Sequence, residues 1–197
     1  MRPLDPRTVR SREAALTAAR ELLVEQGLAG LTHGAVAARG GMSRATLYRL
    51  WPEPPELIRD TVVSHIAQRQ SRPTGDLRED LATELSRIRS MLHEPATQQG
   101  MRVMIERAGV DPVFADIKRT LYESGTRVIR AILTDGAARA ELPADLDIDL
   151  AVDELVGPLF YRRLVADRVF DDEYVHRVVD DYLRGQSATP SPPAERP

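Results

Sequence analysis

The sequence predicts an all-α protein of about nine helices. Apolar residues recur at steps of three and four along most of the 197-residue chain, which is the spacing of one helix face. The breaks between these stripes fall at glycines and prolines, which end or begin helices. Residues 32–51 add a third observation, because they have the pattern of two short helices joined by a tight glycine turn.

Composition limits the class of protein. A chain of this length folds as one domain or two small ones, and 42% apolar residues is normal for a globular protein. The absence of cysteine excludes disulfides, thiolate metal sites and cysteine nucleophiles. We expect a cytoplasmic protein, because there is no apolar signal region and no run near the ~18 apolar residues of a membrane span.

The first helix is predicted over residues 8–26. Its apolar stripe comprises Leu16, Ala19, Leu22 and Leu23. Gly27 follows directly and suits the left-handed conformation in which many helices end.

Residues 32–51 are predicted to form a short helix, a tight turn and a second short helix. Thr32 and Ser43 each precede a helix and can cap it through the side-chain hydroxyl. Gly40 and Gly41 stand between the helices, where glycine supplies backbone angles that other residues avoid. A helix of about two turns is not stable alone in water, so both must pack on neighbouring helices.

The second short helix, Arg44–Leu50, has two different faces. Leu47 and Leu50 share the face that is expected to be buried. The opposite face carries positive charge, hydroxyls and a phenol, contributed by Arg44, Thr46, Tyr48 and Arg49. Arginine can pair with guanine in the DNA major groove and hydroxyls can hold phosphates, so this face suits a helix in that groove. The alternative is an ordinary helical hairpin in an unrelated all-α protein.

The segment GMSRATLYRLWP, residues 41–52, resembles the recognition segment of TetR-family transcriptional regulators. The motifs that extend this resemblance over most of residues 8–69 are Arg12–Leu16, Ala19–Leu23, Glu25–Leu28 and Leu31-Thr32. Residues 155–162, LVGPLFYR, resemble a TetR-type C-terminal domain more loosely.

Three positions depart from the family pattern. Leu50 stands where a histidine or another aromatic residue is common. Pro54-Pro55 replaces the usual Ser-Lys pair, which removes one expected phosphate contact. Gly34, in the first short helix, costs about 1 kcal/mol of helix stability relative to alanine.

The exposed face and the resemblance together predict the DNA contacts. We expect Arg44 to read a base edge and Ala45 to touch a thymine methyl group. The other expected contacts, mainly to phosphates, are Thr32, Ser43, Thr46, Tyr48 and Arg49. Arg10 and Arg12 adjoin residues 1–7, a flexible arm that follows phosphates or enters the minor groove, or else an unused terminus.

A fourth helix is predicted after Trp51-Pro52 and runs to Arg69, because proline is tolerated in a first helical turn. The loop at residues 71–76 is the expected domain boundary. The predicted limits are 8–70 for the helix-turn-helix domain, 76–185 for a ligand-binding and dimerisation domain, and 1–7 and 186–197 for flexible tails.

The second domain is predicted to contain five helices. They begin near Leu77, Thr97, Asp111, Asp147 and Asp172. The helix near Thr97 is expected to turn Met101, Met104 and Ile105 inward. Pro158 should kink the fourth of these helices, and Gly185 should end the last.

The last two helices have more apolar surface than one small domain readily covers. The same pair from a second copy would complete a four-helix bundle, which predicts a homodimer. The expected interface comprises Val152, Leu155, Leu159, Phe160, Val175, Val178, Val179 and Tyr182. The alternative is that both faces pack entirely within one subunit.

The family resemblance also implies a pocket for a small-molecule inducer in the second domain. The candidate residues are Met91, Met101, Met104, Phe114, Leu121 and Tyr122. Flexible methionines and aromatic rings suit an adaptable apolar cavity, and simple core packing is the competing explanation for each. A bound ligand would tilt the fourth helix and spread the two recognition helices of the dimer.

The sequence shows no set of residues for catalysis. The four histidines have no metal-ligand spacing, and neither a Gly-x-Ser-x-Gly elbow nor a phosphate-binding glycine loop is present. We therefore expect neither an enzyme nor a bound cofactor or metal.

Charge is distributed unevenly along the chain. Residues 1–72 contain 11 Arg, no Lys and 7 Asp or Glu, a net charge of +4. The remaining residues then hold 16 of the 27 basic and 23 of the 30 acidic side chains, a net charge of −7. A basic front suits a regulator, more specifically a repressor, that binds a double-stranded DNA operator. The alternative is a helical interaction protein whose basic front binds a protein partner or anionic lipid.

Overall fold

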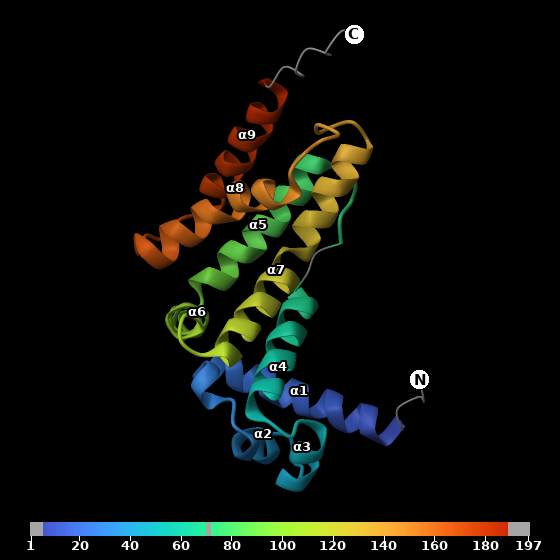
Figure 1. Ribbon diagram of the computed structural model, residues 1–197, viewed down its shortest axis with the longest axis vertical. Coiled ribbons are helices and arrows are strands. Elements are labelled where there is room, and N and C mark those ends of the chain that lie inside the picture. The colour runs from blue at the N-terminus through green and yellow to red at the C-terminus, as the bar shows by residue number, and fades with distance from the viewer. Residues whose placement is uncertain (1–5, 70–71, 189–197) are drawn as a thin grey trace. The chain divides into compact units, whose positions relative to one another are not determined.

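The computed structural model describes residues 6–69 and 72–188, and every regular element in these residues is helical (Figure 1). Within this part of the chain there are nine α-helices, a 3-10 turn and a π-helical turn. The prediction of an all-α protein with about nine helices is therefore confirmed. None of the described helices is long and apolar enough to cross a membrane.

The described residues form two compact units. The first comprises residues 6–69 and 94–125, and the second comprises residues 72–93 and 126–188. The sequence-based boundary near residues 71–76 lies between α4 and α5 but does not divide these units, because α6 and the first half of α7 pack with the first. The limits 8–70 and 76–185 thus remain a proposal.

The first unit contains the predicted helix-turn-helix. Its elements are α1 (Pro6–Gln26), η1 (Leu28–Gly30), α2 (His33–Arg39), α3 (Arg44–Leu50), α4 (Pro54–Arg69), α6 (Pro95–Ala108) and the start of α7 (Pro112–Ala138). In Figure 1, α2 and α3 lie side by side. A core with Leu22, Leu47, Trp51 and Leu57 holds the short helices on α1 and α4, as two-turn helices require.

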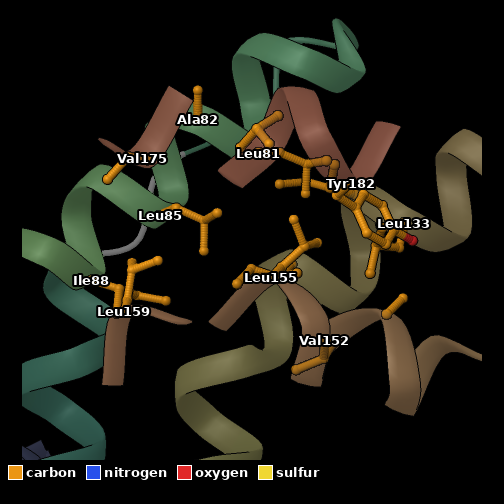
Figure 2. Close-up of a cluster of buried hydrophobic side chains, with 14 of the residues drawn as sticks. Leu81, Ala82, Leu85, Ile88, Leu133, Val152, Leu155, Leu159, Val175 and Tyr182 are labelled. Carbon is orange, nitrogen blue, oxygen red and sulfur yellow. The ribbon is translucent and has the colours of Figure 1, made fainter. Parts of the chain in front are cut away.

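The second unit packs three complete helices with the end of α7. These helices are α5 (Leu77–His93), α8 (Ile148–Phe160) and α9 (Asp172–Ala188), with the π-helical turn η2 (Tyr161–Val165) after α8. Figure 2 shows Leu85 of α5, Leu133 of α7, Leu155 of α8 and Tyr182 of α9 in one apolar cluster. Asp147, near which this helix was predicted to begin, caps α8, because its carboxylate accepts hydrogen bonds from the backbone N–H groups of the first turn.

Several local predictions are corrected. Ile105 is 54% exposed rather than turned inward, whereas Met104 is buried. Gly185 does not end the last helix, which continues to Ala188, and the rest of the predicted C-terminal tail, residues 189–197, lies outside the described residues. Arg7 belongs to α1 rather than to a flexible arm, of which residues 1–5 also lie outside the described part. The π-helical turn after α8 was not predicted.

Gly27 differs in detail from the prediction. Its φ of 68° is positive, as expected for the residue after α1, but its ψ of −165° is extended rather than left-handed helical. This conformation is accessible mainly to glycine, and it redirects the chain from α1 into η1.

Candidate nucleic-acid interface

Both short helices of the helix-turn-helix are capped by the residues that the sequence predicts. The Thr32 hydroxyl accepts a hydrogen bond of 3.1 Å from the backbone N–H of Ala35. The Ser43 hydroxyl accepts one of 3.1 Å from the backbone N–H of Thr46. Each bond satisfies a backbone donor that a helix start would otherwise leave unpaired. Gly41 has a φ of 62°, which explains why the turn requires glycine.

The side chains of α3 separate as the sequence predicts. Leu47 is fully buried and Leu50 packs against the same core from a partly exposed position. Arg44, Ala45, Tyr48 and Arg49 are exposed, and Tyr48 retains 52% of its accessible surface. Thr46 is half-buried, with its hydroxyl 2.9 Å from that of Ser43. The exposed face therefore combines two guanidinium groups, a phenol and hydroxyls.

His33 of α2 packs against α3. Its Nε2 lies 2.8 Å from the carbonyl oxygen of Trp51, at the end of α3. Its ring stacks on Tyr48 with 4.3 Å between centroids and 6° between planes. The buried imidazole therefore contacts α3 both at its exposed face and at its end. This role of His33 could not be predicted, because a histidine in the first turn of α2 has no sequence pattern that specifies its partner across the motif.

Arg44 and Arg49 differ from other arginines of the first unit in having no internal partner. Within residues 6–69 and 72–188, neither guanidinium forms a hydrogen bond or an ion pair. Arg39, in contrast, pairs with Glu25 at 2.6 Å and Glu21 at 3.3 Å, and the hydrogen bond that it donates to Glu25 raises the pKa of Arg39 further above its ordinary value. The charges of Arg44 and Arg49 are therefore available to phosphate or base edges.

Arg12 is placed differently from the expectation. Its guanidinium forms an ion pair with Asp60 of α4 and lies 4.8 Å from the centre of the Trp51 ring. Asp60 also accepts a hydrogen bond of 2.7 Å from Nε1 of Trp51. The side chain proposed for DNA is thus engaged in an internal ion pair, although it remains 39% exposed. Arg10 is exposed, and its Nε donates to the backbone carbonyl of Pro6 at 3.4 Å.

The residues expected at the dimer interface occupy the core of one subunit. Val152, Leu155, Leu159, Val175 and Val179 are fully buried, and Tyr182 is 7% exposed. Phe160 and Val178 are partly buried and pack against the same core. The fully buried side chains cannot contact a second copy, which corrects that part of the prediction. The physical reason is that α5 and α7 already cover the faces of α8 and α9 that the sequence left without a partner.

The six residues proposed for an inducer are divided between the two units. Met91 lies in the second unit, whereas the other five, Met101, Met104, Phe114, Leu121 and Tyr122, lie in the first. Met91 and Met104 are buried, Met101 and Leu121 half-buried, and Tyr122 44% exposed. Phe114 lines a cavity of about 270 Å³ in the first unit.

Comparisons with known proteins decide the family. Residues 15–59 match the family model described as "Bacterial regulatory proteins, tetR family". Residues 72–182 match the model described as "Tetracyclin repressor-like, C-terminal domain". The chain belongs to the TetR family. A TetR-family member is a DNA-binding transcriptional regulator of the helix-turn-helix type.

Relatives of the TetR family match over nearly the whole chain. YdeS of Bacillus subtilis, an uncharacterised regulator of the helix-turn-helix type, is 30% identical over 93% of both chains. The DNA-binding transcriptional repressor TetR of Mycobacteroides abscessus is 29% identical over 88% of this chain and 92% of its own. The crystal structure of the TetR-family regulator SCO0332 is 30% identical, with a TM-score of 0.78 over 89% of this chain and 98% of that protein.

Proposed function

We propose that this TetR-family protein is a dimeric repressor that binds a near-palindromic operator and is released by a small-molecule inducer. The observation that carries the proposal is the exposed face of α3, where Arg44 and Arg49 stand beside Tyr48 without internal partners. The relative from Mycobacteroides abscessus is named a repressor, which supports repression here.

Each exposed side chain has a proposed role. Arg44 reads a base edge in the major groove, and Ala45 contacts a thymine methyl group. Ser43, Thr46, Tyr48, Arg49 and Thr32 contact phosphates or a mixture of groups. Arg10 can reach phosphates because its guanidinium is exposed. Arg12 contributes indirectly, because its bond to Asp60 fixes α1 against the helix that follows α3.

The proposed dimer uses surface that the subunit leaves open. A groove between α8 and α9 is lined by Glu154, Pro158, Arg177, Val178 and Asp181. Leu150 and Tyr161, at the two ends of the outer side of α8, are exposed apolar residues. A second copy of the same pair of helices would cover them in a four-helix bundle. The proposed dimerisation domain, residues 76–185, contains α8 and all but the last three residues of α9.

The dimer can be tested by adding charge to that surface. Leu150→Glu combined with Tyr161→Glu should convert the protein to a monomer in sedimentation experiments, because carboxylates would be buried without partners. The matched control is Val110→Glu combined with Val113→Glu, at exposed positions of the first unit. A parent protein that sediments as a monomer would reject the dimer.

Operator selection from random DNA with the purified protein tests the function as a whole. We expect a two-fold symmetric motif with half-sites about one helical turn apart, or a multiple of that distance. Arg44→Ala should lose about 1–3 kcal/mol of discrimination between the operator and scrambled DNA. Arg119→Ala, an exposed arginine paired with Glu123 on α7, is the control. Selectivity of Arg44→Ala equal to that of the parent would exclude the assigned role.

A salt titration separates DNA binding through phosphates from other uses of the basic surface. The logarithm of operator affinity should fall with the logarithm of salt concentration at a slope of roughly −0.9 per phosphate contact. Arg49→Ala should reduce the slope by about one such contact and weaken operator and scrambled DNA alike. An unchanged slope would remove Arg49 from the set of phosphate contacts.

A further inference from the structure

A cavity of about 270 Å³ lies in the first unit, outside the helix-turn-helix. It lies between η1, α4, α6 and the start of α7. Its apolar wall includes Leu28, Ile58, Val103, Phe114 and Ile117. The volume is close to the lower limit of about 300 Å³ for pockets that bind drug-sized ligands, so it suits a molecule of one or two rings or a short aliphatic chain.

One positive charge stands among these apolar residues. Arg107 lines the cavity, and its guanidinium lies 4.3 Å from the centre of the Phe114 ring. The nearest carboxylate oxygen paired with it, Oδ2 of Asp111, is 3.5 Å away, at the outer limit of a hydrogen bond. A guanidinium has five donors, so Arg107 retains donors for a second anion. An apolar wall with one such cation complements an apolar molecule that carries a carboxylate.

The first wall of the cavity is connected to the start of the helix-turn-helix. Leu28 is the first residue of η1. Its backbone carbonyl accepts a hydrogen bond of 3.2 Å from the N–H of Leu31. The next N–H, that of Thr32, donates to the carbonyl of Gly30 at 3.0 Å. Thr32 caps α2, so a displacement of η1 moves the helix that supports α3.

The second wall is connected to the end of the recognition helix. Ile58 lies on α4, in the same turn as Asp60, whose carboxylate holds the indole N–H of Trp51 at 2.7 Å. Trp51 is the residue that ends α3. Arg59 of the same turn pairs with Asp116 of α7 at 3.6 Å, so α4 is also tied to the opposite wall. The walls of the cavity are therefore connected to both ends of the α2–α3 pair.

We propose that this cavity binds a small aromatic or aliphatic carboxylate, with its carboxylate on Arg107, and that occupancy lowers operator affinity. This regulatory role depends on the proposed function as a repressor, whereas binding itself does not. The ligand separates η1 and α4 from α6 and α7, and it shifts DNA binding by its differential affinity for the two arrangements of α2 and α3.

Calorimetric titration of the full chain with 2-naphthoate, octanoate and the neutral 2-naphthamide tests the site. At least one carboxylate should bind at millimolar concentrations or below. Arg107→Met should weaken carboxylate binding about tenfold or more and leave 2-naphthamide unaffected, because the lost interaction is charge-assisted. Val103→Trp should abolish binding by filling the cavity. Arg119→Met, an exposed arginine on α7 that does not line the cavity, should bind as the parent does.

The same carboxylate should weaken operator binding about tenfold for the parent and leave Val103→Trp unresponsive. If neither carboxylate binds, or if Arg107→Met and Val103→Trp both bind like the parent, the cavity is not the site and the inference is wrong. If binding follows the expected pattern but operator affinity is unchanged, the regulatory part is wrong. If selection yields no operator at all, the proposed function fails while the titrations still decide the ligand site.

Discussion

The guanidinium of Arg44 lies beside Gly34, in space that the absence of a side chain at Gly34 leaves open. A Cβ atom on residue 34 would be 3.2 Å from Nη2 of Arg44 and 3.5 Å from its Cζ. The α2 residue beside the proposed base-reading side chain thus has no side chain of its own. Glycine at this position lowers helix stability by up to about 1 kcal/mol relative to alanine. It also leaves room for the Arg44 guanidinium, a packing role that the sequence did not reveal.

Gly34→Ala should separate stability from DNA recognition. We expect the free energy of unfolding to rise by up to about 1 kcal/mol, because alanine favours the helix. We expect operator affinity to fall severalfold, because Arg44 must move away from a contact that is tighter than ordinary packing. Chemical denaturation and operator titration measure the two effects.

A second glycine provides the control for this substitution. Gly125 lies in α7, and a Cβ there would meet nothing within 4 Å. Gly125→Ala should therefore stabilise the protein without changing operator affinity. Equal operator affinity of Gly34→Ala and the parent would show that the Arg44 side chain is not positioned by the space at Gly34.

His33 should contribute separately through its hydrogen bond and its ring. His33→Phe keeps a ring to stack on Tyr48 but leaves the buried carbonyl of Trp51 without its partner, which should cost about 1–3 kcal/mol of folding free energy. His33→Asn retains a donor and loses the stack, so its larger effect should be on operator affinity through Tyr48. Trp51 is the only tryptophan and is buried, so its fluorescence reports unfolding directly. Parent-like stability of His33→Phe would contradict the assigned hydrogen bond.

Local signals in the sequence were sufficient for the helix caps and for the bounds of the fourth helix. The caps at Thr32, Ser43 and Asp147 depend on a hydroxyl or carboxylate that reaches backbone N–H groups two or three residues ahead, so neighbouring residues decide them. The fourth helix ends at Arg69 as predicted and begins at Pro54, because proline fits a first turn. These features need no knowledge of tertiary structure.

Features that depend on partners distant in the chain were not predictable. Periodicity showed that α8 and α9 each bury a face, but it could not show that α5 and α7 cover those faces within the subunit. Arg12 is separated by 48 residues from the carboxylate of Asp60 that holds it, and nothing near Arg12 specifies that pair. The exposed face of α3 could be predicted because one short helix contains it, whereas the contact of His33 with Tyr48 crosses the turn between two helices.

Asp80 should make the second unit sensitive to acid. Burial of this carboxyl raises its pKa, but the hydrogen bonds from the backbone N–H groups of Thr74 and Gly75 and from the Thr74 hydroxyl outweigh burial, and the net pKa is lowered. The stabilisation is therefore present above the unfolded-state pKa of about 3.9 and is lost as the pH falls through the lower folded-state value.

Asp80→Asn tests this dependence on pH. The variant should be less stable than the parent at pH 7. The two oxygens of the charged carboxylate accept three hydrogen bonds, whereas the asparagine amide has one acceptor oxygen and no charge. The difference between the two proteins should shrink as the pH falls below about 4, because the unfolded parent then takes up a proton at Asp80 that the folded parent binds only at lower pH. Circular dichroism during thermal unfolding at several pH values gives the comparison. A constant difference across this range would mean that the Asp80 charge does not stabilise the fold.

Tyr182 should respond in the opposite pH range. Its hydroxyl is buried without a hydrogen-bond partner among the described residues, beside the groove between α8 and α9. Burial, and to a lesser extent the charge of Glu154, raises the pKa of Tyr182 to about 12. Because the folded state resists deprotonation, the stabilisation is complete below the unfolded-state pKa of about 10 and is lost as the pH rises towards 12.

Tyr182→Phe removes this titration and leaves the packing of the ring unchanged. At neutral pH the variant should be at least as stable as the parent, because it no longer buries an unsatisfied hydroxyl. Between about pH 10 and pH 12 the parent should lose stability relative to the variant. The other four tyrosines are common to both proteins, so the difference between their unfolding curves isolates Tyr182. A variant clearly less stable than the parent at pH 7 would show that the hydroxyl has a partner in solution, and the second subunit facing this groove would be the first place to look for it.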